Sequence, residues 1–192
     1  KIIVEITEGL GNQLFMYAHA YSMAKKLDYD LLIDNKSAYS FKKNTLRKHQ
    51  KYMLDSFNIT ENYATTKFIY DKRYKRLKKN FLIFLDRFKN KKFFFKEKII
   101  KIDNSKIPQN YTKLIKNNFS DNIYVQGNFE NYKYFDQFKD ELCTFLTPKK
   151  ELINPNDEIK QKLINNNSVS IHIRRNRFSD QIGLTDTAKN KE

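Results

Sequence analysis

Two short segments, far apart in the chain, carry the residue types best suited to chemistry. The first, GLGNQ at residues 9–13, follows an apolar run at residues 2–6. Glycines let a backbone come close to a ligand, and the beginning of the helix that follows offers N–H groups to an anion. A tight strand-to-helix turn without a ligand would use the same residues, and the third glycine of the dinucleotide-binding fingerprint is missing.

The second segment is SIHIRR at residues 170–175, which continues an apolar run that begins at Val169. On a strand, His172 and Arg174 point to the same side, and Arg175 falls at the strand's end, where the ligand crevices of α/β proteins open. Arginine stays charged and can grip two phosphate oxygens at once. A strand end pinned by salt bridges is the alternative. Together the two segments indicate an enzyme that handles a nucleotide-linked substrate.

The elements around these segments predict an α/β fold. Residues 2–6 and 30–34 are typical of buried strands, and the apolar spacing between them predicts a helix that ends near Leu27, with Asn12 as its N-cap. A strand, glycine turn, helix and strand in this order favour a parallel sheet. Residues 122–126 predict another strand, followed by a helix over about 132–145, and residues 93–95 and 99–102 are short strand candidates.

A basic stretch at residues 61–90 is predicted to be mainly helical. Its apolar residues fit one face, which we expect to pack on the core while the basic face is solvated. Attachment to an anionic membrane is the second interpretation, and nucleic-acid binding is a third. The apolar face holds Tyr70, Tyr74, Leu77, Phe81, Phe84, Leu85 and Phe88, and the basic face holds Lys72, Arg73, Lys75, Arg76, Lys78 and Lys79.

Composition limits the remaining possibilities. The 192 residues carry a net charge of +15, which attracts polyanions, although the Lys-, Asn-, Ile- and Phe-rich composition also fits the codon bias of AT-rich bacterial genes. No apolar run is long enough to span a membrane. The single Cys143 excludes an internal disulfide, suits a reducing cytosol, and is expected to pack as a small hydrophobe. The D-x-D at Asp28–Asp30 is interpreted as a solvated turn, and the three histidines lack metal-ligand spacing.

Three ordered segments resemble the bacterial α-1,2-fucosyltransferases of glycosyltransferase family 11. EGLGNQLFMYAHA is similar to that family's opening GGLGNQ(M/L)FQYA, with Glu8 in place of a glycine. NIYVQGNFENYKYF at residues 122–135 looks like the family's middle segment, and His172, Arg174 and Arg175 match its H-x-R-R-x-D motif. The Gly-Asp that usually follows the second arginine is replaced by Asn176-Arg177, and the nearest acid is Asp180.

The resemblance implies a GT-B fold, in which two Rossmann-like domains face each other across a cleft. Residues 1–150 would form the acceptor-side domain, with the basic insertion at about 61–102. Residues 151–192 would supply an interdomain helix and the first strand of a donor domain that is otherwise truncated, and a chain ending there is expected to have little activity. The implied reaction is inverting transfer of L-fucose from GDP-β-L-fucose to the 2-hydroxyl of a galactoside on a surface glycan. The resemblance implies no metal or other cofactor and no nucleic-acid partner, with a location in the cytoplasm or on the inner membrane's cytoplasmic face.

The resemblance also suggests roles for the two segments. Arg174 would neutralise the charge that grows on the leaving GDP, Arg175 would assist, and His172 would orient an arginine or contact the nucleotide. Across the cleft, near the donor phosphate or the acceptor, would lie Gly9, Gly11, Asn12 and Gln13. No residue stands out as the general base. Another GT-B nucleotide-sugar transferase and a non-catalytic polyanion- or membrane-binding domain remain the rival interpretations.

Overall fold

The computed structural model describes residues 1–40, 51–60, 62–86, 97–101, 122–150, 158–169 and 171. The chain divides into two compact units, Lys1–Ile153 and Asn154–Glu192.

In the described part of the first unit, four strands form one parallel sheet in the order β2-β1-β4-β3. Ile2 on the central strand lies opposite Leu31 on one side and Ile123 on the other. The predicted parallel α/β arrangement is therefore confirmed, while the strand candidate at residues 93–95 lies outside the described residues. The strands are β1 (Ile2–Glu5), β2 (Leu31–Asp34), β3 (Glu97–Lys101) and β4 (Asn122–Gln126).

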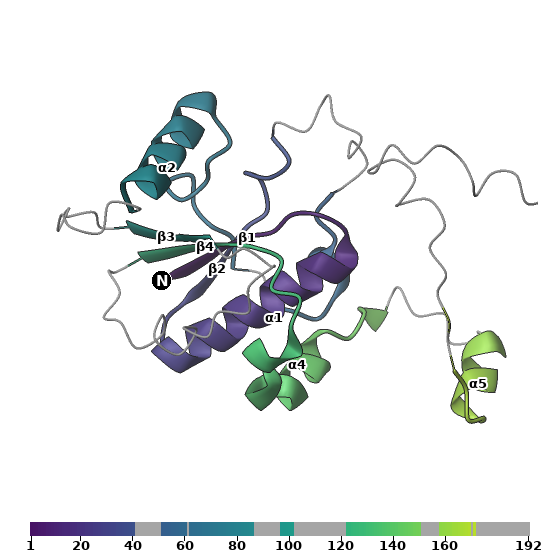
Figure 1. Cartoon of the computed structure of the whole chain (residues 1–192). Helices are drawn as coiled ribbons and strands as arrows, with labels where there is room; N and C mark the ends of the chain where they lie inside the picture. The colour runs from purple at the N-terminus through teal and green to yellow at the C-terminus, as the bar shows by residue number, and fades with distance from the viewer. Residues whose placement is uncertain are drawn as a thin grey trace, which may run out of the picture. The chain divides into compact units, whose positions relative to one another are not determined.

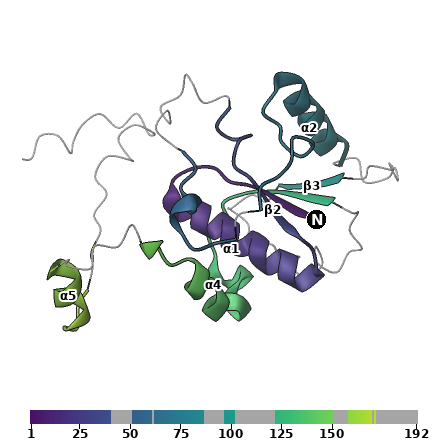
Figure 2. The ribbon, with the colours of Figure 1, turned by 180° about the vertical axis from the view of Figure 1, so that it is seen from behind.

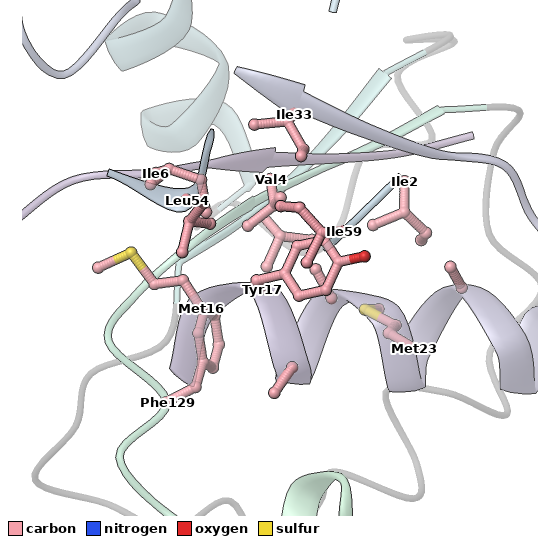
Figure 3. Packing of buried hydrophobic residues seen from close by; sticks show 14 of the residues in the cluster. Ile2, Val4, Ile6, Met16, Tyr17, Met23, Ile33, Leu54, Ile59 and Phe129 are labelled. Carbon is pink, nitrogen blue, oxygen red and sulfur yellow. The ribbon is translucent and has the colours of Figure 1, made fainter. Parts of the chain in front are cut away.

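The main core lies between one face of this sheet and helix α1 (Leu10–Leu27) (Figure 3). Alternate strand residues, such as Ile2 and Val4, point to this face, as the two-residue period of a strand requires. Leu54, in the short 3₁₀ helix η1 (Leu54–Ser56), closes one end of the core. Burial of this apolar surface is the main favourable term that holds α1 on the sheet.

Helix α1 is buried on most of its circumference because it is covered from two sides. The sheet lies on one side, and the chain that follows β4 lies on the other (Figures 1 and 2). That second cover is built from two 3₁₀ turns, η2 (Tyr132–Tyr134) and η3 (Asp136–Phe138), and helix α4 (Lys139–Phe145). The single helix predicted there is thus interrupted at Phe135, whose backbone leaves the helical region. Cys143 is exposed on α4, so the expectation that it packs as a buried hydrophobe is wrong.

The opposite face of the sheet is covered by residues 62–71 and helix α2 (Arg73–Asp86) (Figure 1). Residues 62–72 are predicted to be helical, but in the structure they are not. The backbone N–H of Ile33 in β2 donates to the Asn62 carbonyl, and the Ile33 carbonyl accepts from the Ala64 N–H, so this segment begins alongside the strand. The following apolar residues, including Phe68 and Tyr70, then pack on Ile3 and Tyr124.

The part of the predicted apolar face that lies on α2 is not turned toward the core, so the expectation is wrong for it, although Tyr70, which precedes the helix, does pack on the core. The stripe residues Tyr74, Leu77, Phe81 and Phe84 are between 51% and 69% exposed, whereas Lys79, predicted to be solvated, is buried. The side chains of Leu85 and Phe88 lie outside the described residues. Among the helices that the structure describes, none is both long and apolar enough to cross a bilayer.

In the second unit, helix α5 (Glu158–Ile164) is present where a helix was predicted. Of the strand predicted at residues 169–173, only Val169 and Ile171 are described, and both are exposed and irregular.

His19 titrates abnormally because it lies inside the core. Its ring stacks on Phe129 with centroids 3.8 Å apart and meets the edge of Tyr134 at 5.0 Å. Burial, reinforced by the positive charge of Lys26, lowers the pKa of His19 from 6.5 to about 3. The folded protein therefore keeps this imidazole neutral at pH values where the unfolded chain binds a proton.

We expect this histidine to make the fold acid-sensitive. Between pH 6.5 and about 3 only the unfolded state is protonated at His19, so the free energy of unfolding should fall by about 1.4 kcal/mol per pH unit as the pH drops. Urea unfolding at several pH values would measure this slope, and His19→Leu should remove it while leaving the contribution of the carboxylates. An equal slope in both proteins would contradict the assignment.

Candidate functional site

Three neighbouring strands end in polar residues at the same edge of the sheet. Glu5 closes β1, Asp34 closes β2 and Gln126 closes β4, and Glu5 lies directly opposite Asp34 in the register. Because all strands are parallel, this is the carboxyl edge, outside which α/β proteins bind their ligands. The glycine segment at residues 9–13 begins a few residues after β1 ends, so it lies at this edge too.

The carboxylate of Glu5 is the centre of a polar network. Its Oε2 accepts hydrogen bonds from the Lys79 ammonium, the Tyr124 hydroxyl and the Gln126 amide, each at 2.7 Å. The side chains of Glu5 and Lys79 are only 12% and 7% exposed. Charges this far from water are tolerated only when they are paired and hydrogen-bonded. The network therefore ties α2 to the end of the central strand.

Asp34 extends the network to the loop after β2. Its carboxylate accepts hydrogen bonds from the backbone N–H groups of Lys36 and Ser37 at 3.0 and 2.9 Å, and from the Ser37 hydroxyl. The Tyr124 hydroxyl lies 2.6 Å from Asp34 Oδ2, so its single proton is shared between Asp34 and Glu5. The Ser37 hydroxyl in turn accepts from the backbone N–H of Tyr70 at 2.6 Å. Burial first, and then the charges of Glu5 and Asp34, raise the pKa of Tyr124, so it stays a donor.

Sequence reasoning missed these residues. The available signal was that the apolar runs IIVE, LLID and NIYVQ each end in a polar residue, at the strand ends where crevices open. Their hydrogen bonds go to one another and to loops. The network therefore ties together the strand ends, the loop after β2 and α2 at the same edge of the sheet as the glycine segment.

Helix α1 begins earlier than predicted. Its N-cap is Gly9, with φ −81° and ψ 170°, and the Gly9 carbonyl accepts the first intrahelical hydrogen bond from Gln13 N–H at 3.1 Å. Asn12 is therefore the third residue inside the helix, so its prediction as the N-cap is wrong. The extended backbone of Gly9 performs that function without a side chain.

The two glycines are not required by packing. Apart from the chain neighbours and the nearby backbone of α1 itself, no heavy atom of the described residues lies within 4 Å of a Cβ built on Gly9 or Gly11, and both glycines are exposed. The residue with the left-handed backbone is instead Glu8, at φ 64°, where a non-glycine residue costs about 1–3 kcal/mol. A tight turn therefore does not explain the glycines. They leave open space at the beginning of α1.

Gln13 secures the turn that precedes this opening. Its side chain is fully buried, and its Nε2 lies 2.7 Å from the carbonyl of Lys51, 2.9 Å from that of Glu8 and 3.2 Å from the Tyr39 hydroxyl. Its Oε1 accepts from the backbone N–H of Met53 at 2.9 Å. The amide group is thus committed to three segments of the chain, including the strained residue Glu8.

Asn12 differs from its neighbour. Its side chain is half-buried and has no hydrogen-bond partner in the part of the chain that the structure describes. Its amide is therefore available to a ligand at the carboxyl edge.

The remaining predicted site residues are not brought together with these. His172, Arg174 and Arg175 lie outside the described residues. Asp28 is the left-handed C-cap of α1 and Asp30 pairs with Lys1 at 3.1 Å, and no group of three or more His, Cys, Asp or Glu side chains within the described ranges is arranged to hold a metal. A hollow of about 580 Å³ lies beside α4, lined by Phe135, Leu142 and Leu146 among others, but it does not include the glycine segment.

Comparison with known proteins finds similarity to a sugar-transferring enzyme. It is 27% identical over 185 residues to the α-1,2-colitosyltransferase of Escherichia coli, an alignment that covers 94% of this chain and 56% of that protein. The chain is thus a distant homologue of an α-1,2-glycosyltransferase and spans about half of its length, which confirms the resemblance drawn from the three segments. No protein-family model matches the chain. No solved structure matches it either.

We expect Gln13 and Asn12 to respond differently to substitution. Gln13→Leu keeps the volume but leaves buried backbone groups without partners, so it should lower the free energy of unfolding by about 3 kcal/mol. Asn12→Ala should change it by less than about 0.5 kcal/mol. Urea unfolding of both variants tests this pair, and equal losses would contradict the division between a positioning and an available side chain.

Proposed function

We propose that this chain is the acceptor-side domain, residues 1–150, and the beginning of the donor domain of a GT-B glycosyltransferase. The observation that carries the proposal is the open, glycine-lined beginning of α1 at the carboxyl edge of a parallel sheet. The homology to an α-1,2-glycosyltransferase supports the same class. The reaction would be inverting transfer of L-fucose from GDP-β-L-fucose to the 2-hydroxyl of a terminal galactose on a surface glycan.

In this reaction, the acceptor oxygen attacks C1 of the sugar while the bond from C1 to the β-phosphate oxygen breaks. Negative charge then grows on GDP, and the proton of the acceptor hydroxyl is released to a base or to water. A site that works without a metal must balance the charge with fixed cations. We assign that role to Arg174, with Arg175 assisting and His172 orienting an arginine or contacting the nucleotide.

The glycine segment would face those residues across the cleft. The backbone of Gly9 and Gly11 can come close to a substrate because neither carries a side chain, and the Asn12 amide can donate to a phosphate or a sugar hydroxyl. Gln13 would contribute indirectly, because its buried amide holds the turn that precedes the opening. This positioning role replaces the direct contact with the donor that we expected of Gln13.

A second donor is favoured by one specific observation, the name of the E. coli relative, which is a colitosyltransferase. Colitose is L-fucose without its 3-hydroxyl, so the two donors differ by a single polar group. A site that hydrogen-bonds the 3-hydroxyl rejects the donor that lacks it far more strongly than an apolar site rejects an added hydroxyl. A non-catalytic polyanion-binding domain would explain the net charge but not the open glycine segment.

We expect GDP-sugars to stabilise the longest natural form of the protein. A thermal shift should appear with GDP-fucose or GDP-colitose, be smaller with GDP-mannose, be absent with UDP-galactose, and be indifferent to EDTA. The larger of the first two shifts identifies the donor. No shift with any sugar nucleotide, together with salt-sensitive binding to DNA, would support the binding-domain alternative instead.

Arg174→Ala should lower kcat about 100- to 1000-fold, as is typical when one charge-stabilising donor is removed from a transition state. Transfer of labelled sugar to a galactoside would measure it, in the same natural form of the protein. Arg73→Ala, which changes an exposed arginine at the beginning of α2, is the control and should retain near-normal turnover. Full activity of Arg174→Ala would remove this residue from the mechanism.

A further inference from the structure

Helix α2 is amphipathic, but its apolar stripe faces solvent and not the core. Its four stripe residues, Tyr74, Leu77, Phe81 and Phe84, follow each other at intervals of three or four residues, so they share one face. All four are more than half exposed. Surface helices of globular proteins normally turn such a stripe toward the core.

The rotation of α2 is set by a buried charge on its other side. Lys79 is five residues from both Tyr74 and Phe84, which at about 100° per residue places it about 140° from each. Its ammonium donates to Glu5 at 2.7 Å and lies 5.1 Å and 5.2 Å from the ring centroids of Tyr70 and Tyr124. Rotating α2 to bury the stripe would expel this ammonium and leave the Glu5 carboxylate buried without its cation.

A second lysine anchors the same side of the helix. The ammonium of Lys75 donates to the backbone carbonyls of Thr66 at 2.6 Å and Ile69 at 3.2 Å. Both anchors attach α2 to the segment and the strand beneath it. The outward position of the stripe is therefore specified by side-chain contacts.

Basic residues border the exposed stripe on both sides. At about 100° per residue, Arg73 and Arg76 lie along one flank and Lys78 along the other, and all three are exposed. Along its 14 residues, α2 is about 21 Å long, so it suits a position in the plane of a surface. Apolar side chains flanked by cations match the boundary of a bilayer, where acyl chains lie beneath anionic headgroups.

We propose that α2 is a membrane-docking helix that lies on an anionic lipid bilayer. Tyr74, Leu77, Phe81 and Phe84 enter the boundary between headgroups and acyl chains, while Arg73, Arg76 and Lys78 contact lipid phosphates. The anchored face with Lys79 remains on the protein. Docking does not depend on which sugar the enzyme transfers.

Sedimentation with vesicles tests this proposal in the purified protein. We expect binding to vesicles of phosphatidylcholine and phosphatidylglycerol at 3:1, little binding to pure phosphatidylcholine, and weaker binding at higher salt. Leu77→Ser/Phe81→Ser should lower partitioning at least 10-fold with an unchanged melting temperature, because both residues are exposed. Arg73→Gln/Arg76→Gln/Lys78→Gln should lower it about 100-fold. The matched control, Leu163→Ser/Ile164→Ser on α5, replaces two equally exposed apolar residues and should bind normally.

Four results would overturn the proposal. The first is equal binding to neutral and anionic vesicles, and the second is normal binding by the Leu77→Ser/Phe81→Ser variant. The third is a loss of vesicle binding in the α5 control as large as that in the stripe variant. The fourth is that the longest natural form fails to bind vesicles that the 192-residue chain binds. The last result would show that other parts of the protein cover the stripe. Transfer to a soluble galactoside, measured in parallel, should be unchanged in the stripe variant. Loss of docking and failure of the proposed function are thereby distinguished.

Discussion

Two carboxylates buried at the carboxyl edge of the sheet set the constraint on which much of the first unit depends. Glu5 and Asp34 end neighbouring strands side by side; Asp34 is fully buried and the Glu5 side chain is 12% exposed, so both need hydrogen-bond donors. The Tyr124 hydroxyl lies between the two and shares its single proton with them, Lys79 supplies a cation to Glu5, and Ser37 in the loop after β2 donates to Asp34. Satisfying these groups draws together β1, β2, β4 and α2, which are distant in sequence.

At the same edge of the sheet, the adjacent residues Asn12 and Gln13 of α1 have different roles. Gln13 is turned inward and holds the turn at Glu8 and the backbone at Lys51 and Met53, while Asn12 and the two glycines remain accessible. The helix can therefore keep its beginning open without losing its attachment. A ligand site at this edge needs this combination, because a ligand must reach backbone groups that do not move.

The same network accounts for the basic insertion. The net charge of +15 indicated an anionic partner without locating it. In the folded chain, Lys79 forms an ion pair with Glu5 at the carboxyl edge of the sheet. Its position turns the apolar stripe of α2 outward, between Arg73, Arg76 and Lys78. One ion pair thus links the interior of the candidate site to a surface suited to a membrane. An acceptor carried by a lipid would be reached from such a surface.

The sequence by itself located several of the local elements and indicated a distant relationship to an α-1,2-glycosyltransferase. Two-residue and 3.6-residue periods located β1, α1, β2 and β4, and the spacing of three short motifs indicated the glycosyltransferase relationship, because these signals are local. Only the tertiary structure decided which face of α2 is buried, that Gln13 is committed to three loops, and that Glu5 and Asp34 meet. Those outcomes depend on charges and hydrogen-bonding groups that pair between residues 26 to 121 positions apart in the sequence, and no local pattern encodes such pairs.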